Sequence, residues 1–387
     1  MRIGIITYWA TNDNYGQQLQ CWALQQILIK FGHEPFLIKY DPYTKPPQKE
    51  KKSFIRRLSR YLLIYPLFLN VYSRYRKNKR IKNNEKRRFV DFRNNNILST
   101  NVVYHSLAEL QSAPPEADCY LSGSDQVFAA LVNNRENHTY FLDFGDESII
   151  RVSYAASFGR KEYPKELRNE LFRLLSRFRV LLVREKSGID ICKEIGLSAK
   201  VVLDPTLLLN MNDYMNKLVG TSFNISSKYI YIYSINIRNK NEVEWNEITK
   251  FAKANSCKIL ITTASGYFQG EEVFPFGEYK YATIQEWLCN IFSSKYIVTT
   301  SFHGVVFSIL FHKPFVWFPL KGTFSRGNAR VEELLNELEL TNYIWDQNKS
   351  LDVIFSSNVD WNKVDRLIED RREESLAALK NALQYNF

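Results

Sequence analysis

Short apolar segments alternate with longer segments of helical periodicity along most of this 387-residue chain, and this pattern restricts the folds that the chain can adopt. The first apolar run occupies 3–7, a helical pattern follows at 19–30 and ends near Gly32, and a second apolar run occupies 35–40. A strand, a helix and a strand in this order form a βαβ unit, whose two strands lie parallel in one sheet. The beginning of the chain therefore predicts a parallel sheet.

The same alternation returns in two later series. The strands expected there are short, continuous apolar runs, at 118–121, 151–155, 180–183, 200–203, 229–234, 258–262, 296–299 and 315–318. Helical patterns separate these runs, and we expect a change of domain between Asn210 and Ser227. We therefore predict an α/β protein with two successive doubly wound, Rossmann-like domains.

The predicted domains are residues 1–215 and residues 216–345. A charged, amphipathic C-terminal segment, 346–387, is expected to be helical and to pack back on the first domain. Residues 45–95 interrupt the first domain as an insertion. Ligands of doubly wound sheets bind beyond the carboxyl ends of the strands, so we expect a site there and in the cleft between the domains.

The insertion carries the whole positive charge excess of the chain. Between Lys45 and Arg93 there are 17 basic and 3 acidic residues, a net charge of +14, whereas the rest of the chain has a net charge of −3. Apolar and aromatic residues recur with helical spacing at 54–65, with arginines between them. Such a stretch is typical of a helix at an anionic membrane surface, and it is also consistent with a solvated hairpin packed on the host domain. Nucleic acid is not an expected partner, because no nucleic-acid-binding module surrounds the charge.

Several classes of protein lose support because the sequence lacks their patterns. The five cysteines are scattered without a CxxC pair, which argues against a disulfide framework and a structural zinc site. The sequence shows no secretory signal and no continuous run of about 20 apolar residues. It also lacks the GxGxxG, GxxxxGK[ST] and HExxH patterns of dinucleotide, P-loop and metal sites. We expect a cytoplasmic protein without a dedicated metal site.

Polar residues collect directly after two of the predicted strands. The segment 14–17 follows the first strand and contains Gly16, which allows a ligand to approach the backbone. The segment 122–126 follows a later strand, and its Asp125 is suited to accept hydrogen bonds from sugar hydroxyls. For both segments, the start of a helix with an N-cap is the alternative interpretation.

A histidine follows another predicted strand. The strand 296–299 leads into Thr300-Ser301-Phe302-His303-Gly304 and then into a very apolar helix. His303 therefore lies near a helix N-terminus and a strand's carboxyl end, a position that suits a general acid or base. A structural role is the alternative for a single histidine.

Three arginines also occupy loops that follow strands. Arg184 comes directly after the strand 180–183, where it would point into the cleft, with an ion pair to Glu185 as the alternative. Arg326 and Arg330 follow the last apolar strand, before or within a helix start. An arginine binds a carboxylate or a phosphate through two parallel hydrogen bonds, so these residues predict an anion site, with a solvated loop as the alternative.

These segments, in this order, resemble those of the polysaccharide pyruvyl transferase family. The matching segments run nearly the length of the chain and are Ile3-Gly4-Ile5-Ile6-Thr7, Asn14-Tyr15-Gly16, the helix and strand at 20–40, Gly123-Ser124-Asp125-Gln126-Val127, 154–159, Val183-Arg184-Glu185, Val202-Leu203-Asp204-Pro205-Thr206 and Ser301-Phe302-His303-Gly304. Each is short, and their order and spacing across two α/β halves make the match specific. The resemblance implies the two-domain architecture of GT-B glycosyltransferases.

The resemblance also implies an activity. It implies transfer of the enolpyruvyl group of phosphoenolpyruvate to a pair of sugar hydroxyls, which gives a cyclic pyruvate ketal and releases phosphate. Family members act in the synthesis of bacterial capsules, exopolysaccharides and cell-wall polymers. The implied partners are phosphoenolpyruvate as donor substrate and a sugar acceptor, and no cofactor or metal is implied.

Roles for individual residues follow from the same resemblance. It implies that His303 and Arg184 are catalytic, and Asp125 is our candidate for orienting or deprotonating the acceptor hydroxyl. The residues expected to bind the donor are Arg184, Ser301, His303, Gly304, Arg326 and Arg330. The residues expected to bind the acceptor are Asn14, Tyr15, Gln17, Asp125 and Gln126. Some members carry an arginine where this chain has Ser301, so we expect Arg326 or Arg330 to supply the second donor arginine.

The basic insertion adds an expectation about location. Polymer repeat units are often built on polyprenyl-diphosphate carriers, and a segment of charge +14 would hold the protein to anionic lipid beside such a carrier. We therefore expect a peripheral protein on the inner face of the plasma membrane. Two other functions stay open from sequence: a GT-B glycosyltransferase with a nucleotide-sugar donor, and a non-catalytic, membrane-associated assembly protein.

Overall fold

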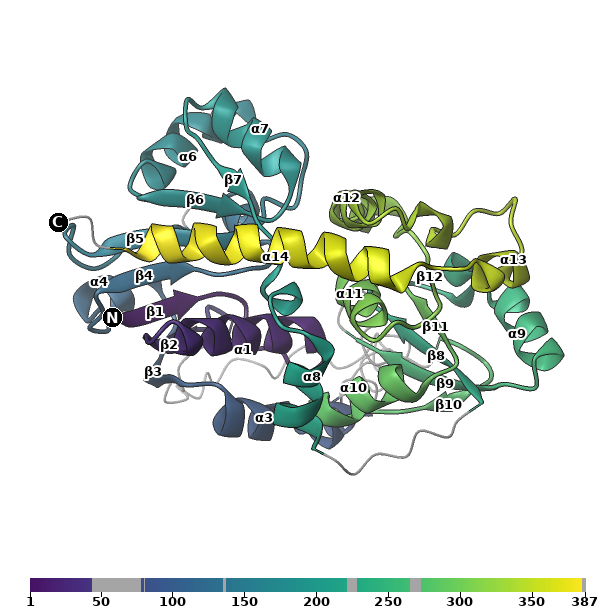
Figure 1. Cartoon of the computed structure of the whole chain (residues 1–387). Coiled ribbons are helices and arrows are strands. Elements are labelled where there is room, and N and C mark those ends of the chain that lie inside the picture. Colours follow the sequence, from purple (N-terminus) through teal and green to yellow (C-terminus); the bar gives the residue numbers. More distant parts are fainter. Residues whose placement is uncertain (44–77, 80, 135–136, 221–227, 265–272, 385–387) are drawn as a thin grey trace, which may run out of the picture.

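Two parallel β-sheets follow one another along the chain, and helices flank each of them (Figure 1). The computed structural model describes residues 1–43, 78–79, 81–134, 137–220, 228–264 and 273–384. Every strand pair in both sheets is parallel. The predicted α/β fold of two Rossmann-like domains is therefore confirmed.

The first domain contains a seven-stranded sheet with the order β3-β2-β1-β4-β5-β6-β7. Its strands are β1 (Arg2–Ile6), β2 (Glu34–Tyr40), β3 (Ser99–Tyr104), β4 (Cys119–Ser122), β5 (Ile150–Ala156), β6 (Val180–Val183) and β7 (Lys200–Val201). Its helices are α1 (Tyr15–Lys30), α3 (Phe89–Asn96), α4 (Leu107–Ser112), α5 (Ala130–Asn133), α6 (Arg168–Leu175), α7 (Lys186–Glu194) and α8 (Met211–Tyr214). The strand order reverses between β1 and β4, which places a ligand crevice beyond the carboxyl ends of these two strands.

The second domain contains a five-stranded sheet with the order β10-β9-β8-β11-β12. Its strands are β8 (Tyr229–Ser234), β9 (Lys258–Thr263), β10 (Glu278–Tyr279), β11 (Tyr296–Thr299) and β12 (Phe315–Trp317). Its helices are α9 (Trp245–Ala254), α10 (Ile284–Ser293), α11 (Phe302–Leu310), α12 (Ala329–Glu337) and α13 (Leu351–Ser356). The order reverses here between β8 and β11, and α11 begins directly after β11.

Central strands agree with the apolar runs, whereas the edges of the sheets differ. Strands β6 and β11 begin and end where the sequence predicts them. Strand β3 was not predicted, because it lies at the edge of the first sheet and half of its residues are exposed, so it has no apolar run. Strand β7 is shorter than expected and ends at Val201. The predicted amphipathic helix at 54–65 lies outside the described residues.

The C-terminal helix α14 (Trp361–Leu383) lies across both domains (Figure 1). At its start, the imidazole of His312 lies 2.8 Å from the carboxylate of Asp365 in α14. Further along, Ser375 Oγ accepts a hydrogen bond from the backbone of Leu203, and Arg372 Nε donates to the carbonyl of Leu207. Helix α14 thus contacts the second domain near its beginning and the first domain near its end.

Arg87, near the end of the basic insertion, is buried inside the protein. Arg87 is only 1% exposed, and its two terminal nitrogens donate to Tyr15 Oη and to the carbonyl of Thr263, both at 2.6 Å. Tyr15 Oη in turn donates to the carbonyl of Ala282 at 2.6 Å. Because Thr263 and Ala282 belong to the second domain, Arg87 joins α1 of the first domain to the second. The expectation that residues 45–95 face an acceptor or a membrane is therefore wrong for this residue.

No helix in the described residues has the length and apolarity that crossing a membrane requires.

We predict that Arg87→Met lowers the free energy of unfolding by about 2–4 kcal/mol, because it leaves the carbonyl of Thr263 buried without a donor and removes a bond to Tyr15. Urea denaturation of the full chain measures this. The matched control is Arg88→Met, since Arg88 is exposed and pairs with Asp91 at 2.7 Å. Its effect should be about 1 kcal/mol or less. Equal effects of the two substitutions would contradict the role given to Arg87.

Candidate active site

The predicted strand-end residues of the first domain meet the beginning of α11 from the second domain. His303 is the second residue of α11, and its ring packs directly on Gly16 near the start of α1. A Cβ atom at position 16 would lie 1.9 Å from His303 Nδ1, so no side chain fits there. Gly16 therefore provides a flat surface for the histidine.

Asp204, which follows β7, is the carboxylate at the centre of this contact. It is 2% exposed. Its Oδ2 accepts hydrogen bonds from Ser124 Oγ at 2.7 Å and from Arg184 Nη1 at 3.2 Å. Its Oδ1 accepts from Thr206 and lies 3.7 Å from His303 Nε2. Burial alone would raise the pKa of Asp204, but His303, Arg184 and Thr206 outweigh it and lower that pKa well below its usual range.

Two arginines flank the ring of Phe302. The guanidinium carbons of Arg184 and Arg330 lie 5.3 and 5.4 Å from the centre of that ring. Burial would lower the pKa of Arg184, but the carboxylates of Asp204 and Glu185 raise it. For Arg330, burial and the neighbouring charge of Arg184 lower the pKa to about 10. Two positive charges thus lie close together, and the second is poorly compensated.

Several charged atoms in this cluster are buried without a hydrogen-bond partner. They are Arg184 Nε and Nη2, Arg330 Nε, His303 Nε2 and Glu185 Oε2. Arg184 Nε and Glu185 Oε2 lie 3.7 Å from each other, and His303 Nε2 lies 3.7 Å from Asp204 Oδ1, so Arg184 Nη2 and Arg330 Nε are the donors that a ligand can take up. Buried polar atoms in folded proteins are almost always paired, so unpaired donors gathered in one place indicate the site of a ligand. The cavity beside Arg184 and Arg330 measures about 30 Å³, so a ligand larger than water requires movement of side chains or domains to enter.

Asp125 lies at the reversal of strand order in the first sheet. Its backbone is in the left-handed region, with φ of 85°. Its carboxylate accepts hydrogen bonds from Gln17 Nε2 and from the backbone of Gln126, both at 2.8 Å. A non-glycine residue in this conformation is strained, and such strain is commonly found at functional sites. Asp125 therefore links α1 to the loop after β4.

Some residues expected to bind ligands have structural roles instead. Tyr15, an expected acceptor residue, is fully buried and stacks on Trp287 with ring centres 5.1 Å apart, so that prediction is wrong. Asn14 caps α1 by accepting a hydrogen bond from Gln17, as the alternative interpretation had it. Gly304, an expected donor residue, packs against Thr299, since a Cβ atom there would lie 2.1 Å from Thr299 Oγ1. These side chains form the frame of the site.

The remaining predicted residues separate into two places. Ser301 is the N-cap residue of α11 and is buried beside His303. Arg326 lies in the turn 322–327 and lines a separate cavity of about 590 Å³ together with Arg160. Of the two arginines considered from sequence, Arg330 thus joins Arg184, and Arg326 does not. Gln126 lies between the two places, because a Cβ atom on Gly327 would lie 3.6 Å from its Nε2.

Asp204 comes directly after a predicted strand, so the expectation that ligands bind beyond the carboxyl ends of strands could have identified it. The sequence analysis matched Asp204 to the family motif and gave it no role. Glu185 was considered only as a partner of Arg184. It also accepts hydrogen bonds from Ser157 and from the backbone of Phe158. Phe302 carries no polar group, so only the structure shows that two arginines lie against its ring.

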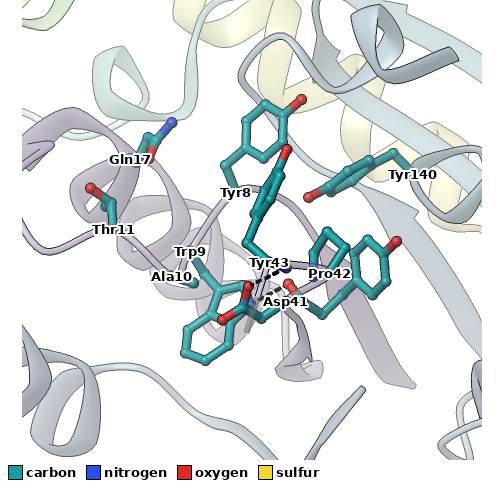
Figure 2. Close-up of a pocket in the computed structure, with 10 residues that line it drawn as sticks. Tyr8, Trp9, Ala10, Thr11, Gln17, Asp41, Pro42, Tyr43 and Tyr140 are labelled. Carbon is teal, nitrogen blue, oxygen red and sulfur yellow. Dashed lines mark hydrogen bonds between the residues drawn. The ribbon is translucent and has the colours of Figure 1, made fainter. Parts of the chain in front are cut away.

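An aromatic pocket of about 370 Å³ adjoins the site at the carboxyl ends of β1 and β2 (Figure 2). Its lining consists mainly of tyrosines and a tryptophan, with a few polar groups: Tyr8, Trp9, Ala10, Thr11, Gln17, Tyr40, Asp41, Pro42, Tyr43 and Tyr140. Gln17, the partner of Asp125, is the one predicted acceptor residue that lines it. Tyr8, Trp9, Tyr40 and Tyr43 were missed in the sequence because each lies in a strand or directly after one, and Tyr140 because it lies in a turn between strands.

Within the described part of the chain, no group of three or more His, Cys, Asp and Glu side chains is arranged to hold a metal ion.

Two Rossmann-like domains that meet at a cluster of arginine and histidine define a protein of GT-B architecture. The chain belongs to the polysaccharide pyruvyl transferase family, whose family model matches residues 14–322. No curated protein sequence matches the chain significantly.

Solved structures similar to this one share its architecture at low sequence identity. A UDP-N-acetylglucosamine 2-epimerase from Rickettsia bellii is 11% identical over 98% of this chain and 96% of that one, with a TM-score of 0.50. A putative UDP-N-acetylglucosamine 2-epimerase from Listeria monocytogenes is 10% identical over 99% and 96%, with a TM-score of 0.49. The first of these likenesses supports the GT-B fold and nothing about the reaction.

We predict that Asp204→Asn lowers the free energy of unfolding at neutral pH by about 3–5 kcal/mol, because it leaves Arg184 buried without its carboxylate. The pKa of Asp204 is depressed in the folded state. Its contribution is therefore fully present above the unfolded-state pKa of about 4 and is lost as the pH falls below that value. The difference between wild type and variant, measured by urea denaturation, should shrink at about pH 3.

Asp365→Asn is the matched control, since Asp365 pairs with a histidine on the surface and is about half exposed. Its effect should be about 1 kcal/mol or less. A difference between wild type and Asp204→Asn that stays constant down to about pH 3 would contradict the depressed pKa.

Proposed function

We propose that this protein transfers the enolpyruvyl group of phosphoenolpyruvate to two hydroxyls of a sugar and forms a cyclic pyruvate ketal. The observation that carries the proposal is the pair of unpaired, buried donors Arg184 Nη2 and Arg330 Nε beside the ring of Phe302, with His303 next to them. Phosphoenolpyruvate carries a carboxylate and a phosphate, and guanidinium groups bind both through paired hydrogen bonds. Membership of the family supports the same reaction class.

Arg184 and Arg330 are proposed to hold the donor. Asp204 and Glu185 engage one edge of Arg184, which leaves Nη2 for an anion. Arg330 has the less compensated charge, so an anionic group beside it would relieve the repulsion between the two guanidinium groups. Such fixed positive groups stabilise the charge that develops on the departing phosphate without reorganising.

In the proposed reaction His303 acts as general acid and Asp125 as general base. Protonation of the methylene carbon converts it to the methyl group and leaves C2 electron-poor. A sugar hydroxyl adds to C2, the C–O bond to phosphate breaks, and a second hydroxyl adds to C2 to close the ketal. The two hydroxyl protons balance the proton gained by the methyl group and the proton taken up with phosphate. Asp204 orients the imidazole through its contact with His303 Nε2.

We predict that His303→Ala lowers kcat for acceptor-dependent release of phosphate from phosphoenolpyruvate by about 10²–10⁴-fold, the usual contribution of general acid–base catalysis. His312→Ala is the control, because His312 lies on the surface beside Asp365. Activity of His303→Ala within a few-fold of wild type would remove His303 from the mechanism.

Two arginine variants complete this experiment. Arg330→Ala should raise KM for phosphoenolpyruvate, whereas Arg326→Ala, in the separate cavity, should leave it unchanged.

Thermal unfolding separates the proposed pyruvyl transferase from a GT-B glycosyltransferase. Phosphoenolpyruvate should raise Tm of the wild type, and a nucleotide sugar such as UDP-glucose should not. A non-catalytic protein would show neither phosphate release nor this shift.

The acceptor is proposed to be a lipid-linked saccharide in capsule or exopolysaccharide synthesis, with the protein peripheral on the inner face of the plasma membrane. The support is the charge of the insertion, of which Arg87 is used internally. We predict that replacing the lysines and arginines of 49–77 by glutamine abolishes co-sedimentation with phosphatidylglycerol vesicles, because each basic residue contributes about 1 kcal/mol near an anionic surface. Phosphatidylcholine vesicles are the control, and undiminished sedimentation would contradict the proposal.

A further inference from the structure

The aromatic pocket has the dimensions and composition of a small-molecule site. Its volume of about 370 Å³ lies within the usual range for such sites, about 300–1,000 Å³. Residues 8–11 come directly after β1, and residues 40–43 end β2 and follow it. The pocket thus opens at the edge of the sheet where doubly wound domains bind their ligands.

Three tyrosines pack against one another and form one wall of the aromatic pocket. Tyr140 is 2% exposed and meets the rings of Tyr8 and Tyr40 edge to face, with ring centres 4.9 and 5.6 Å apart. Tyr8 Oη donates to the carbonyl of Gln126 at 3.3 Å. These contacts fix the directions of rings that are otherwise free to rotate, so the wall is preformed.

Two further aromatic residues stand toward the opening. The indole of Trp9 donates to the carbonyl of Tyr40 at 2.8 Å, and the guanidinium of Arg93 lies 5.6 Å from its ring centre. Tyr43 is 84% exposed, although its backbone is held by a hydrogen bond to Asp41. In Figure 2 the rings of Tyr8, Tyr43 and Tyr140 gather on one side, and Trp9 and Asp41 lie below them. An exposed tyrosine beside a preformed aromatic wall offers a face on which a flat ligand can stack.

The pocket connects to the proposed chemistry through the loop after β4. Gln17 lines the pocket and donates to the carboxylate of Asp125 at 2.8 Å, and Tyr8 contacts the next residue, Gln126. A ligand in the pocket would therefore lie beside the proposed general base, while the donor arginines come from both domains, Arg184 after β6 and Arg330 from α12.

From this arrangement we propose that the aromatic pocket binds the pyranose ring of a neutral acceptor sugar; the proposal rests on the proposed function and names its acceptor site. The C–H face of a pyranose is apolar and suits the rings of Tyr43 and Trp9, while its hydroxyls suit Asp41 and Gln17 as hydrogen-bonding partners. Among the described residues that line the pocket, Asp41 is the one carboxylate and none is a lysine or an arginine. The described lining thus favours a neutral sugar over one that carries a carboxylate, since the guanidinium of Arg93 beside Trp9 already donates to the carbonyl of Thr11 and to Asn12 Oδ1.

Binding is tested apart from catalysis, by saturation-transfer NMR of the full chain without phosphoenolpyruvate. The probes are the methyl β-D-pyranosides of glucose, galactose, mannose and N-acetylglucosamine, with methyl β-D-glucuronide as the anionic comparison. We expect at least one neutral glycoside to bind saturably and more tightly than the glucuronide. Tyr43→Ala should raise its Kd about tenfold, and Tyr43→Phe, which keeps the ring, should restore it to within about twofold.

Phe276→Ala is the matched control, because Phe276 is an exposed aromatic residue of the second domain that does not line the pocket. Its Kd should equal that of the wild type, and circular dichroism should show all three variants folded. In the transfer assay, Tyr43→Ala should raise KM for the acceptor and leave KM for phosphoenolpyruvate unchanged.

The proposal is overturned if no neutral glycoside binds saturably, if the glucuronide binds as tightly, or if Tyr43→Ala binds like the wild type. Pyruvyl transfer by a protein that fails these tests would leave the proposed function standing without this acceptor site. Glycoside binding that depends on Tyr43, in a protein that releases no phosphate from phosphoenolpyruvate, would support the pocket and contradict the reaction.

Discussion

The buried carboxylate of Asp204 holds together the groups on which the candidate site depends. It accepts hydrogen bonds from Ser124 after β4 and from Arg184 after β6, and it faces His303 of the second domain. A buried charge is tolerated only when partners surround it, so these elements cannot shift independently of one another. The position of the proposed acid and of one donor arginine therefore follows from the electrostatic requirements of a single residue.

The contact between the domains and the geometry of the site share residues. Tyr15 meets Arg87 and the second domain through its hydroxyl, and Gly16, the next residue, supports the ring of His303. A shift of α1 against the second domain would therefore move both contacts. Arg87 lies near the end of the basic insertion. Its hydrogen bond to Tyr15 and the contact of Gly16 with His303 therefore connect this part of the insertion to the site through two consecutive residues of α1.

The site divides into two regions of different chemistry. Arg184, Arg330 and His303 form a charged region at the domain boundary, whereas tyrosines and a tryptophan form an aromatic region at the ends of β1 and β2. Asp125 lies between the two, with Gln17 of the aromatic pocket as its hydrogen-bond partner. Such a division suits a reaction between a small anionic donor and a neutral polyhydroxylated acceptor, because each substrate finds the surroundings that its own charge requires.

The sequence by itself determined the central strands, the parallel topology and the loops that carry chemistry. Buried parallel strands are continuous apolar runs, and polar residues such as Asp125, Arg184 and His303 stand out directly after them. Asp204 follows the same rule. Only the tertiary structure decided which of these residues meet. Arg326 and Arg330 are four residues apart, and Arg87 and Arg88 are adjacent, yet Arg330 lies against Phe302 while Arg326 lines a separate cavity, and Arg87 is buried while Arg88 is exposed. The contacts of Arg184 with Phe302 and of Arg87 with Thr263 join residues far apart in the chain, and they exist because two domains exclude water between them, which local sequence does not specify.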